Sequence, residues 1–206
     1  MIEPEIHGIF PTPIYRSKLN RNFTNKELSF FKKLKWRPNK NNLASVDTYV
    51  LEKPILLKLK KEIDLFVKDY FNKILFLHKS ISPYITQSWL NYTKQKEQHH
   101  SHNHSNSYLS GVLYINADKL TDTISFYNDR YRHLTLSSTK YNLYNSDTWA
   151  FTVESKDIII FPSQTTHFVE EKKHKGARIS LSFNVFLNGN LGAAGDLNQL
   201  YLKKND

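Results

Sequence analysis

The C-terminal part of the chain is a succession of short β-branched and aromatic runs with no helical stretch between them. This pattern restricts the fold more than any other feature of the sequence. Turn-type residues separate many of the runs, as they do in β-proteins. Because no helices alternate with these strands, the pattern predicts an antiparallel barrel or two-sheet jelly roll and not a βαβ fold. The seven predicted strands fall within residues 85–93, 107–116, 123–129, 148–153, 157–163, 166–171 and 177–187.

The N-terminal part has a different pattern. Residues 7–20 alternate apolar and polar positions around two prolines, which predicts an edge strand or an extended segment. Residues 23–35 predict a helix with Thr24 or Asn25 as its N-cap. Residues 36–47, which are rich in Asn and contain one proline, predict a loop.

The clearest helix is predicted over residues 54–77, where Pro54 suits the first turn. Apolar residues recur there at spacings of three and four, which forms one buried stripe. Its members are Leu59, Ile63, Phe66, Tyr70 and Ile74. The 206-residue chain fits a single domain. We expect segments 1–80 to pack as helices and an extended segment on a β core of 81–190, with a tail at 191–206.

Composition narrows the chemistry. The chain contains no cysteine, so any metal must be held by nitrogen and oxygen atoms. No apolar run approaches the roughly 18–20 residues that cross a bilayer, and no secretory signal is evident, so we expect a cytoplasmic protein. The net charge is +10, but acidic residues interrupt each lysine group. A solvated lysine-rich surface is therefore favoured over a nucleic-acid footprint, although a nucleic-acid partner stays possible.

Four of the nine histidines lie within residues 99–104. Side chains on a strand alternate between its two faces, so His100, His102 and His104 are expected on one face and His99 on the other. Histidines two apart at a strand start can present two ligands to one metal ion. The alternative interpretation of this segment is a solvated polar loop.

Two later features favour the metal site. His167 follows an apolar strand and a proline turn, and Arg178 comes 11 residues later on a strand that is otherwise apolar or small. A buried arginine is costly unless it is paired, and its planar fork suits a carboxylate ligand. Ser180 faces the same way as Arg178 and can donate a second hydrogen bond to that carboxylate.

The order of these features resembles the 2-oxoglutarate- and Fe(II)-dependent oxygenases. More narrowly, the chain resembles a 2OG-Fe(II) oxygenase family that shares five blocks in this order, which together run from about residue 9 to 186. Here the blocks read IFPTPIY at 9–15, SWLNY at 88–92, HNHSNSYLSGVLYIN at 102–116, FPSQTTHFV at 161–169 and RISLSFN at 178–184.

The resemblance implies a mainly β fold, namely a double-stranded β-helix (jelly-roll, cupin-like) core with supporting N-terminal helices. It also implies Fe(II), 2-oxoglutarate and O2 as cofactor and cosubstrates, with His102 and His167 as iron ligands. Arg178 and Ser180 would bind the distal carboxylate of 2-oxoglutarate. The remaining expected pocket residues are Tyr114, which would bind that same carboxylate, and Asn91 and Trp89, which would line the pocket.

The third iron ligand departs from the usual pattern of two histidines and one carboxylate. Three alternatives stay open: His104 completes the triad, Asp129 reaches in as the carboxylate, or water fills the position. His104 is favoured because the narrower family shares the His-x-His pair. His99 and His100 would then be supporting or surface residues.

The resulting expectation is an oxygenase that hydroxylates an unidentified substrate and releases succinate and CO2. Two alternatives are a three-histidine cupin-like metalloenzyme without 2-oxoglutarate and a non-enzymatic basic β-sandwich that binds a partner. The substrate class is open among peptidyl or free amino acids, small metabolites and nucleobases, and so is the oligomeric state. Residues 119–147, including Tyr131, are expected at the substrate mouth because such rim loops carry specificity.

Overall fold

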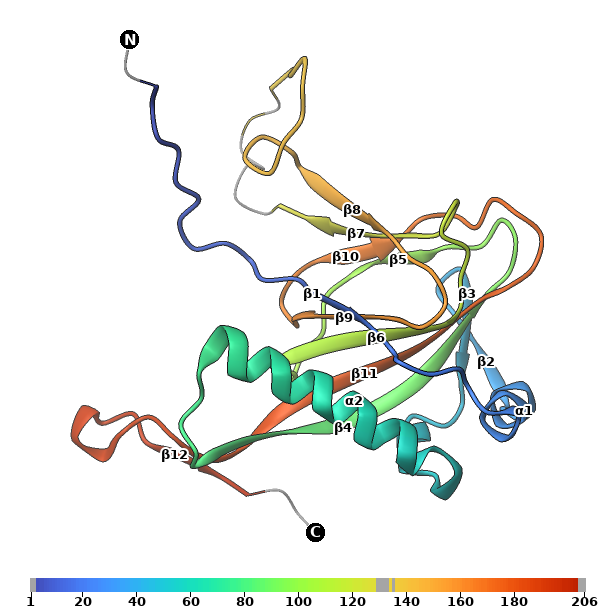
Figure 1. The fold of residues 1–206 in the computed structure, drawn as a ribbon, viewed down its shortest axis with the longest axis horizontal. Helices are drawn as coiled ribbons and strands as arrows, with labels where there is room; N and C mark the ends of the chain where they lie inside the picture. Colours follow the sequence, from blue (N-terminus) through green and yellow to red (C-terminus); the bar gives the residue numbers. More distant parts are fainter. Residues whose placement is uncertain (1–2, 129–133, 135, 204–206) are drawn as a thin grey trace.

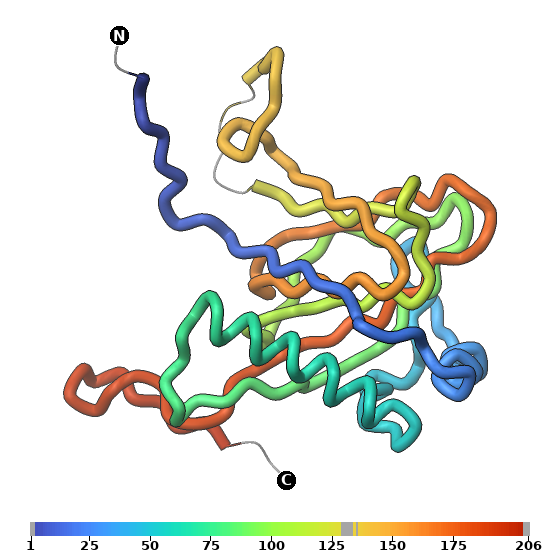
Figure 2. The backbone as a smooth tube through the Cα atoms, viewed as in Figure 1, coloured from blue at the N-terminus to red at the C-terminus, as the bar shows by residue number. Residues whose placement is uncertain are grey.

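The computed structural model describes residues 3–128, 134 and 136–203. Two antiparallel sheets are stacked face to face, and helix α2 covers the outer face of the larger one (Figure 1). This is the predicted mainly β, double-stranded β-helix fold with supporting N-terminal helices. The N-terminal segment before β1 runs away from the body of the molecule (Figure 2).

The larger sheet has the order β1-β9-β6-β11-β4-β3-β2, and β12 pairs with the end of β11. The smaller sheet has the order β5-β10-β7-β8. The larger sheet consists of β1 (Tyr15–Lys18), β2 (Trp36–Asn39), β3 (Asn42–Ser45), β4 (Ile81–Thr93), β6 (Leu109–Asn116), β9 (Asp157–Pro162), β11 (Arg178–Leu191) and β12 (Leu200–Leu202). The smaller sheet consists of β5 (His99–His102), β7 (Thr123–Tyr127), β8 (Thr148–Thr152) and β10 (His167–Val169).

Each of the seven predicted strand regions contains a strand of the structure. Helix α1 (Asn25–Lys33) begins at Thr24, whose side chain forms a capping box with Glu27. The second predicted helix comprises η2 (Pro54–Leu56), α2 (Leu57–Tyr70) and the π-turn η3 (Phe71–Leu75). Its buried face contains Val67, and Phe66 is only half-buried. Two further 3-10 turns are η1 (Val50–Glu52) and η5 (Ala194–Asp196).

The predicted loop at 36–47 is wrong, because this segment forms the β2–β3 hairpin. The hairpin adds two strands to one edge of the larger sheet, where Pro38 is tolerated because an edge strand has a row of backbone groups that need no partner. Asn41 adopts a left-handed φ of 62° in the two-residue turn, which is a conformation that Asn accepts readily.

Alternation along the strands of the larger sheet divides the interior into two layers. Leu90, Leu181 and Phe183 face the helices and join the main core under α2. Their sequence neighbours face the smaller sheet, where a second, smaller core lies. The helix-facing layer is predominantly apolar, whereas the layer between the sheets combines apolar side chains with the polar ones that line the pocket. The polar side chains of the pocket therefore lie between the two sheets, whereas the main hydrophobic core lies beneath α2.

Within the described residues, no helix is long and apolar enough to cross a membrane.

Candidate functional site

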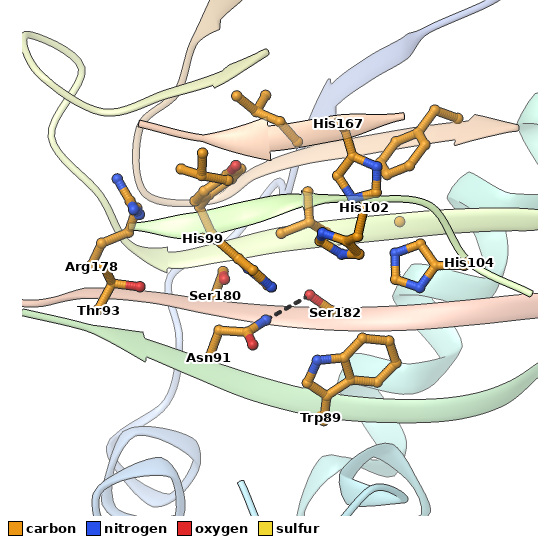
Figure 3. Close-up of a pocket in the computed structure, with 16 residues that line it drawn as sticks. Trp89, Asn91, Thr93, His99, His102, His104, His167, Arg178, Ser180 and Ser182 are labelled. Atoms are coloured by element: carbon orange, nitrogen blue, oxygen red, sulfur yellow. Dashed lines mark hydrogen bonds between the residues drawn. The ribbon is translucent and has the colours of Figure 1, made fainter. Parts of the chain in front are cut away.

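Three histidines converge between the two sheets (Figure 3). His102 ends β5 and His167 begins β10, and these two residues are direct partners across the antiparallel pair. His104 lies in the loop just after β5. One nitrogen from each of the three rings lies within 4.8 Å of the others, which is close enough to share one metal ion.

Burial keeps these imidazoles neutral. It lowers the pKa of His167 to about 3, and neighbouring His102 adds to the effect. Burial likewise lowers the pKa of His104 to about 4 and shifts the pKa of His102 in the same direction. A neutral imidazole keeps a lone pair for a metal ion, so the site is prepared to bind a cation at neutral pH.

The ring orientations of two of these histidines are fixed by backbone contacts. His102 Nδ1 lies 2.8 Å from the carbonyl oxygen of His100, and His167 Nδ1 lies 3.0 Å from that of Thr165. Because Nδ1 must donate to a carbonyl oxygen, Nε2 carries the free lone pair in both rings. Such bonds are the usual way in which proteins orient a metal-binding histidine.

A buried hydroxyl network holds the His104 loop against the turn that precedes His167. The Ser163 hydroxyl donates to Ser107 Oγ at 2.8 Å and lies 2.9 Å from Ser110 Oγ, which in turn donates to Asn184 at 3.0 Å. The backbone N–H of His104 donates to the Ser163 carbonyl at 2.9 Å. These serines come from the blocks that carry the family resemblance, and their contacts set the position of His104 relative to His167.

The prediction that His99 faces away from His102 is wrong. Both residues line the pocket, and their rings stack with centroids 4.7 Å apart. The reason is a register shift: β10 advances two residues from His167 to Val169 while β5 spans three, from His102 to His99. Such a bulge returns a residue three positions away to the same face. His99 and His100 also form a second possible metal-binding group with His102.

The floor of the pocket consists of side chains from three neighbouring strands of the larger sheet, β6, β11 and β4. Ser180 on β11 is the direct partner of Asn91 on β4 and of Tyr114 on β6. One step along β11, Ser182 is the partner of Trp89, and the Asn91 amide donates to the Ser182 hydroxyl at 2.9 Å. All of these residues line the pocket.

Two side chains on the floor of the pocket, Asn91 and Tyr114, have polar groups that are buried. The Asn91 side chain is buried, yet its Oδ1 atom has no hydrogen-bond partner among the described atoms. Such an orphaned acceptor is costly without a ligand. Burial raises the pKa of Tyr114 far above its ordinary value, so its hydroxyl stays protonated and can donate a hydrogen bond.

Arg178 lies at the opposite end of the pocket from His104, with Ser180 and His99 between them (Figure 3). It is 3% exposed, and its Nη1 donates to the carboxylate of fully buried Asp122 at 3.0 Å. Lys172, 4% exposed, donates to the same carboxylate at 3.2 Å. Arg178 is therefore buried and paired, but its partner in the structure is an internal carboxylate and not the carboxylate ligand that the sequence predicts.

Neither the buried Asp122–Lys172 pair nor the inward position of His99 was predicted from the sequence. Lys172 belongs to the run EEKKHK, which carries the same signal as any solvated lysine group. Asp122 precedes a strand, where an acidic turn residue is common. Only the three-dimensional placement distinguishes these two side chains from surface charges.

Asp129, the alternative carboxylate ligand, and Tyr131 lie outside the described residues. Of the described residues that line the pocket, none carries a carboxylate. The donor set available to a metal is therefore three neutral imidazoles, and nitrogen donors of this kind suit Fe(II) as well as other first-row metals.

A triad of neutral imidazoles at one end of a jelly-roll pocket, with a guanidinium at the other, is the layout of a pocket for a metal and an anion. The family model described as "Putative 2OG-Fe(II) oxygenase" matches residues 87–184, which include the triad and Arg178. This match covers just under half of the chain and shows its similarity to the 2OG-Fe(II) oxygenase family, whose members use Fe(II), 2-oxoglutarate and O2. No curated protein matches the sequence.

Several solved structures share the fold. A 2OG-Fe(II) oxygenase-family oxidoreductase from Burkholderia pseudomallei is 13% identical, with a TM-score of 0.57 over 82% of this chain and 83% of that one. HygX from Streptomyces hygroscopicus, solved with nickel, 2-oxoglutarate and hygromycin B, is 10% identical, with a TM-score of 0.58 over 84% and 82%. The carbocyclase SnoK from nogalamycin biosynthesis is 11% identical, with a TM-score of 0.57 over 95% and 90%. At these identities the similarity establishes the fold.

Proposed function

We propose that this protein is a 2-oxoglutarate- and Fe(II)-dependent oxygenase that hydroxylates its substrate and releases succinate and CO2. The observation that supports this most is the shared pocket: three histidine nitrogens within 4.8 Å of one another at one end, and Arg178 at the other. The match to the family model supports the cosubstrate. HygX, which has the same fold, was solved with 2-oxoglutarate bound.

In this proposal His102, His104 and His167 hold Fe(II). When bound, the iron supplies the oxygen chemistry that couples oxidative decarboxylation of 2-oxoglutarate to oxidation of a C–H bond. The chain's own residues bind, orient and exclude water. Arg178 and Ser180 bind the distal carboxylate, and the protonated hydroxyl of Tyr114 is available to donate to the same group.

The walls of the pocket support the exclusion of water. Val112, Ile124 and Phe161 from the core between the sheets line it beside the histidines. Trp89 lies against His104, with ring centroids 5.9 Å apart, and can position a substrate next to the metal. A dry pocket protects a reactive centre from side reactions. The orphaned Asn91 acceptor requires a donor, which 2-oxoglutarate lacks, so a substrate N–H or O–H group or a water fits it better.

The test is iron- and 2-oxoglutarate-dependent formation of succinate by the full-length protein, followed by mass spectrometry with and without candidate substrates. His167→Ala is expected to abolish metal binding and succinate formation. Arg178→Ala is expected to raise the 2-oxoglutarate requirement by roughly tenfold or more while metal binding persists. Exposed His78→Ala and Arg37→Ala are matched controls that should behave like wild type.

A three-histidine metalloenzyme without 2-oxoglutarate is the second candidate. It is supported by the absence of a carboxylate among the described lining residues and by the pairing of Arg178 with Asp122. Calorimetry separates the two candidates. Tight metal binding without metal-dependent binding of 2-oxoglutarate would favour this second function, whereas no metal binding at all would favour a non-enzymatic binding module.

A further inference from the structure

Three buried charges lie together at the Arg178 end of the pocket. Asp122 accepts hydrogen bonds from Arg178 at 3.0 Å, from Lys172 at 3.2 Å and from the backbone N–H of Asp118 at 2.9 Å. Asp122 is 0%, Arg178 3% and Lys172 4% exposed. A lysine is almost never buried to this degree unless it is paired.

The charges in this cluster do not balance. Two cations share one carboxylate, which leaves one buried positive charge. Tyr114, which also lies near Arg178 in the pocket, is kept neutral because burial raises its pKa. Glu170 contributes its carbonyl oxygen to Arg178 at 3.2 Å, while the residue itself is exposed.

An uncompensated buried charge is expensive, so a compensating anion is expected in the folded, liganded protein. Only Arg178 of the two cations lines the pocket. Lys172 is not a lining residue and contacts the shared carboxylate, with its Nζ atom 3.4 Å from Asp122 Oδ1 and 3.2 Å from Oδ2. An arginine paired with Asp122 alone would form a neutral pair with little attraction for a further anion. Lys172 offsets the Asp122 charge and leaves the charge of Arg178 available to the pocket.

We propose that Lys172 is a specificity-determining residue that makes the pocket select a 2-oxo acid with a second, distal carboxylate. It acts through Arg178 and Asp122 and does not touch the ligand, so it is a positioning residue. This inference rests on the proposed function, because it takes the histidine triad as the place where the 2-oxo acid end is held. One negative charge on the distal carboxylate matches the one excess positive charge of the cluster.

The backbone around Lys172 supports a fixed placement. Its carbonyl accepts from the N–H of Lys96 at 2.9 Å, and its own N–H donates to the carbonyl of Glu97 at 2.9 Å. These bonds attach the segment between β10 and β11 to the turn that precedes β5. Because they involve only backbone atoms, a side-chain substitution at Lys172 leaves them in place.

The experiment compares two ligands on the full chain loaded anaerobically with Co(II). Calorimetry measures binding of 2-oxoglutarate and of 2-oxopentanoate, which has the same chain length but lacks the distal carboxylate. Wild type is expected to prefer 2-oxoglutarate. Lys172→Met is expected to weaken 2-oxoglutarate binding by roughly tenfold or more, with 2-oxopentanoate and Co(II) binding unchanged. A merely structural role of Lys172 would weaken both ligands alike.

Two further variants test the charge argument directly. Lys172→Arg keeps the charge and should keep the preference. The double variant Asp122→Asn with Lys172→Met also keeps one excess positive charge, and it should recover the preference that Lys172→Met loses. An unchanged preference in Lys172→Met would overturn this inference alone. Wild type that binds Co(II) but neither 2-oxo acid would instead overturn the proposed function, and this inference with it.

Discussion

At the scale of single residues, the site depends on side chains that never touch a metal. Ser163 is fully buried, and its hydroxyl joins Ser107 to Ser110 at the base of the His104 loop. The backbone of the same residue holds His104. One serine thus links the two segments that bring His104 and His167 together, so its effects should extend from stability to metal binding.

We predict that Ser163→Ala lowers the free energy of unfolding by about 1–3 kcal/mol, because it removes a shared partner from buried hydroxyls. It should also weaken Co(II) binding, since the His104 loop loses part of its support. Chemical denaturation and metal titration measure the two effects. Ser105→Ala, at an exposed position in the same loop, is the control and should change neither. Unaltered stability and affinity in Ser163→Ala would show that the network is dispensable.

At the scale of elements, the first turn of helix α1 contains a buried carboxylate, while Phe31 of the same helix packs in the main core. Glu27 is 3% exposed and receives two hydrogen bonds from Arg21, at 2.7 and 2.8 Å, as well as the capping-box bond from Thr24. Burial opposes ionisation of Glu27, but the hydrogen bonds from Arg21 and Thr24 outweigh it and lower the pKa. The ionised form is therefore the one that stabilises the fold.

A carboxylate with a lowered pKa contributes stability above its unfolded value near 4.5, and this contribution disappears as the pH falls through its folded value. We predict that Glu27→Gln destabilises the protein at pH 7 and that the difference from wild type narrows below pH 4.5. Denaturant titrations of both proteins at pH 7 and below pH 4.5 measure this difference in the free energy of unfolding. Glu171→Gln, at an exposed site, is the control. A difference that stays constant with pH would exclude Glu27 as its source.

The elements that could be predicted from the sequence are those with a regular pattern of apolar residues. Strand β9, where four consecutive residues are buried, and helix α2, whose buried residues recur along one face, have such patterns. The family blocks also indicated residues whose physical role the structure now explains. A side chain at Gly111 would place its Cβ atom 2.2 Å from the ring of Phe183, so only glycine fits between these neighbouring strands.

The elements that could not be predicted owe their structure to distant partners. The β2–β3 hairpin is polar and rich in Asn, and it becomes a strand pair because β4 offers it a sheet edge. The inward orientation of His99 depends on a bulge against β10, which lies more than 60 residues later. The Asp122 cluster likewise joins Asp122 to Lys172 and Arg178, which lie 50 and 56 residues later in the sequence. Local patterns carry no information about such pairings.

At the scale of the whole molecule, the two sheets differ in how they are stabilised. The larger sheet shares the main core with the helices, which includes the buried face of α2. The smaller sheet has only the smaller core between the sheets, and two of its four strands, β5 and β10, are four and three residues long. The histidine triad lies on β5, β10 and the loop beside them. A bound metal would therefore support the part of the fold that has the least hydrophobic support.

We predict that binding of Co(II) stabilises the smaller sheet more than the larger one. Saturating Co(II) should raise the unfolding free energy by about 2.7 kcal/mol at a hundredfold excess over the dissociation constant. Hydrogen exchange should slow most in β5, β10 and the adjoining β7, because a metal that joins the end of β5 to the start of β10 opposes local opening of that sheet. The β4 and β11 amides beneath α2 serve as an internal control and should change less. His167→Ala should remove the effect, while His78→Ala should preserve it. Equal slowing across both sheets, or protection that survives in His167→Ala, would mean that a metal at the triad does not specifically stabilise the smaller sheet.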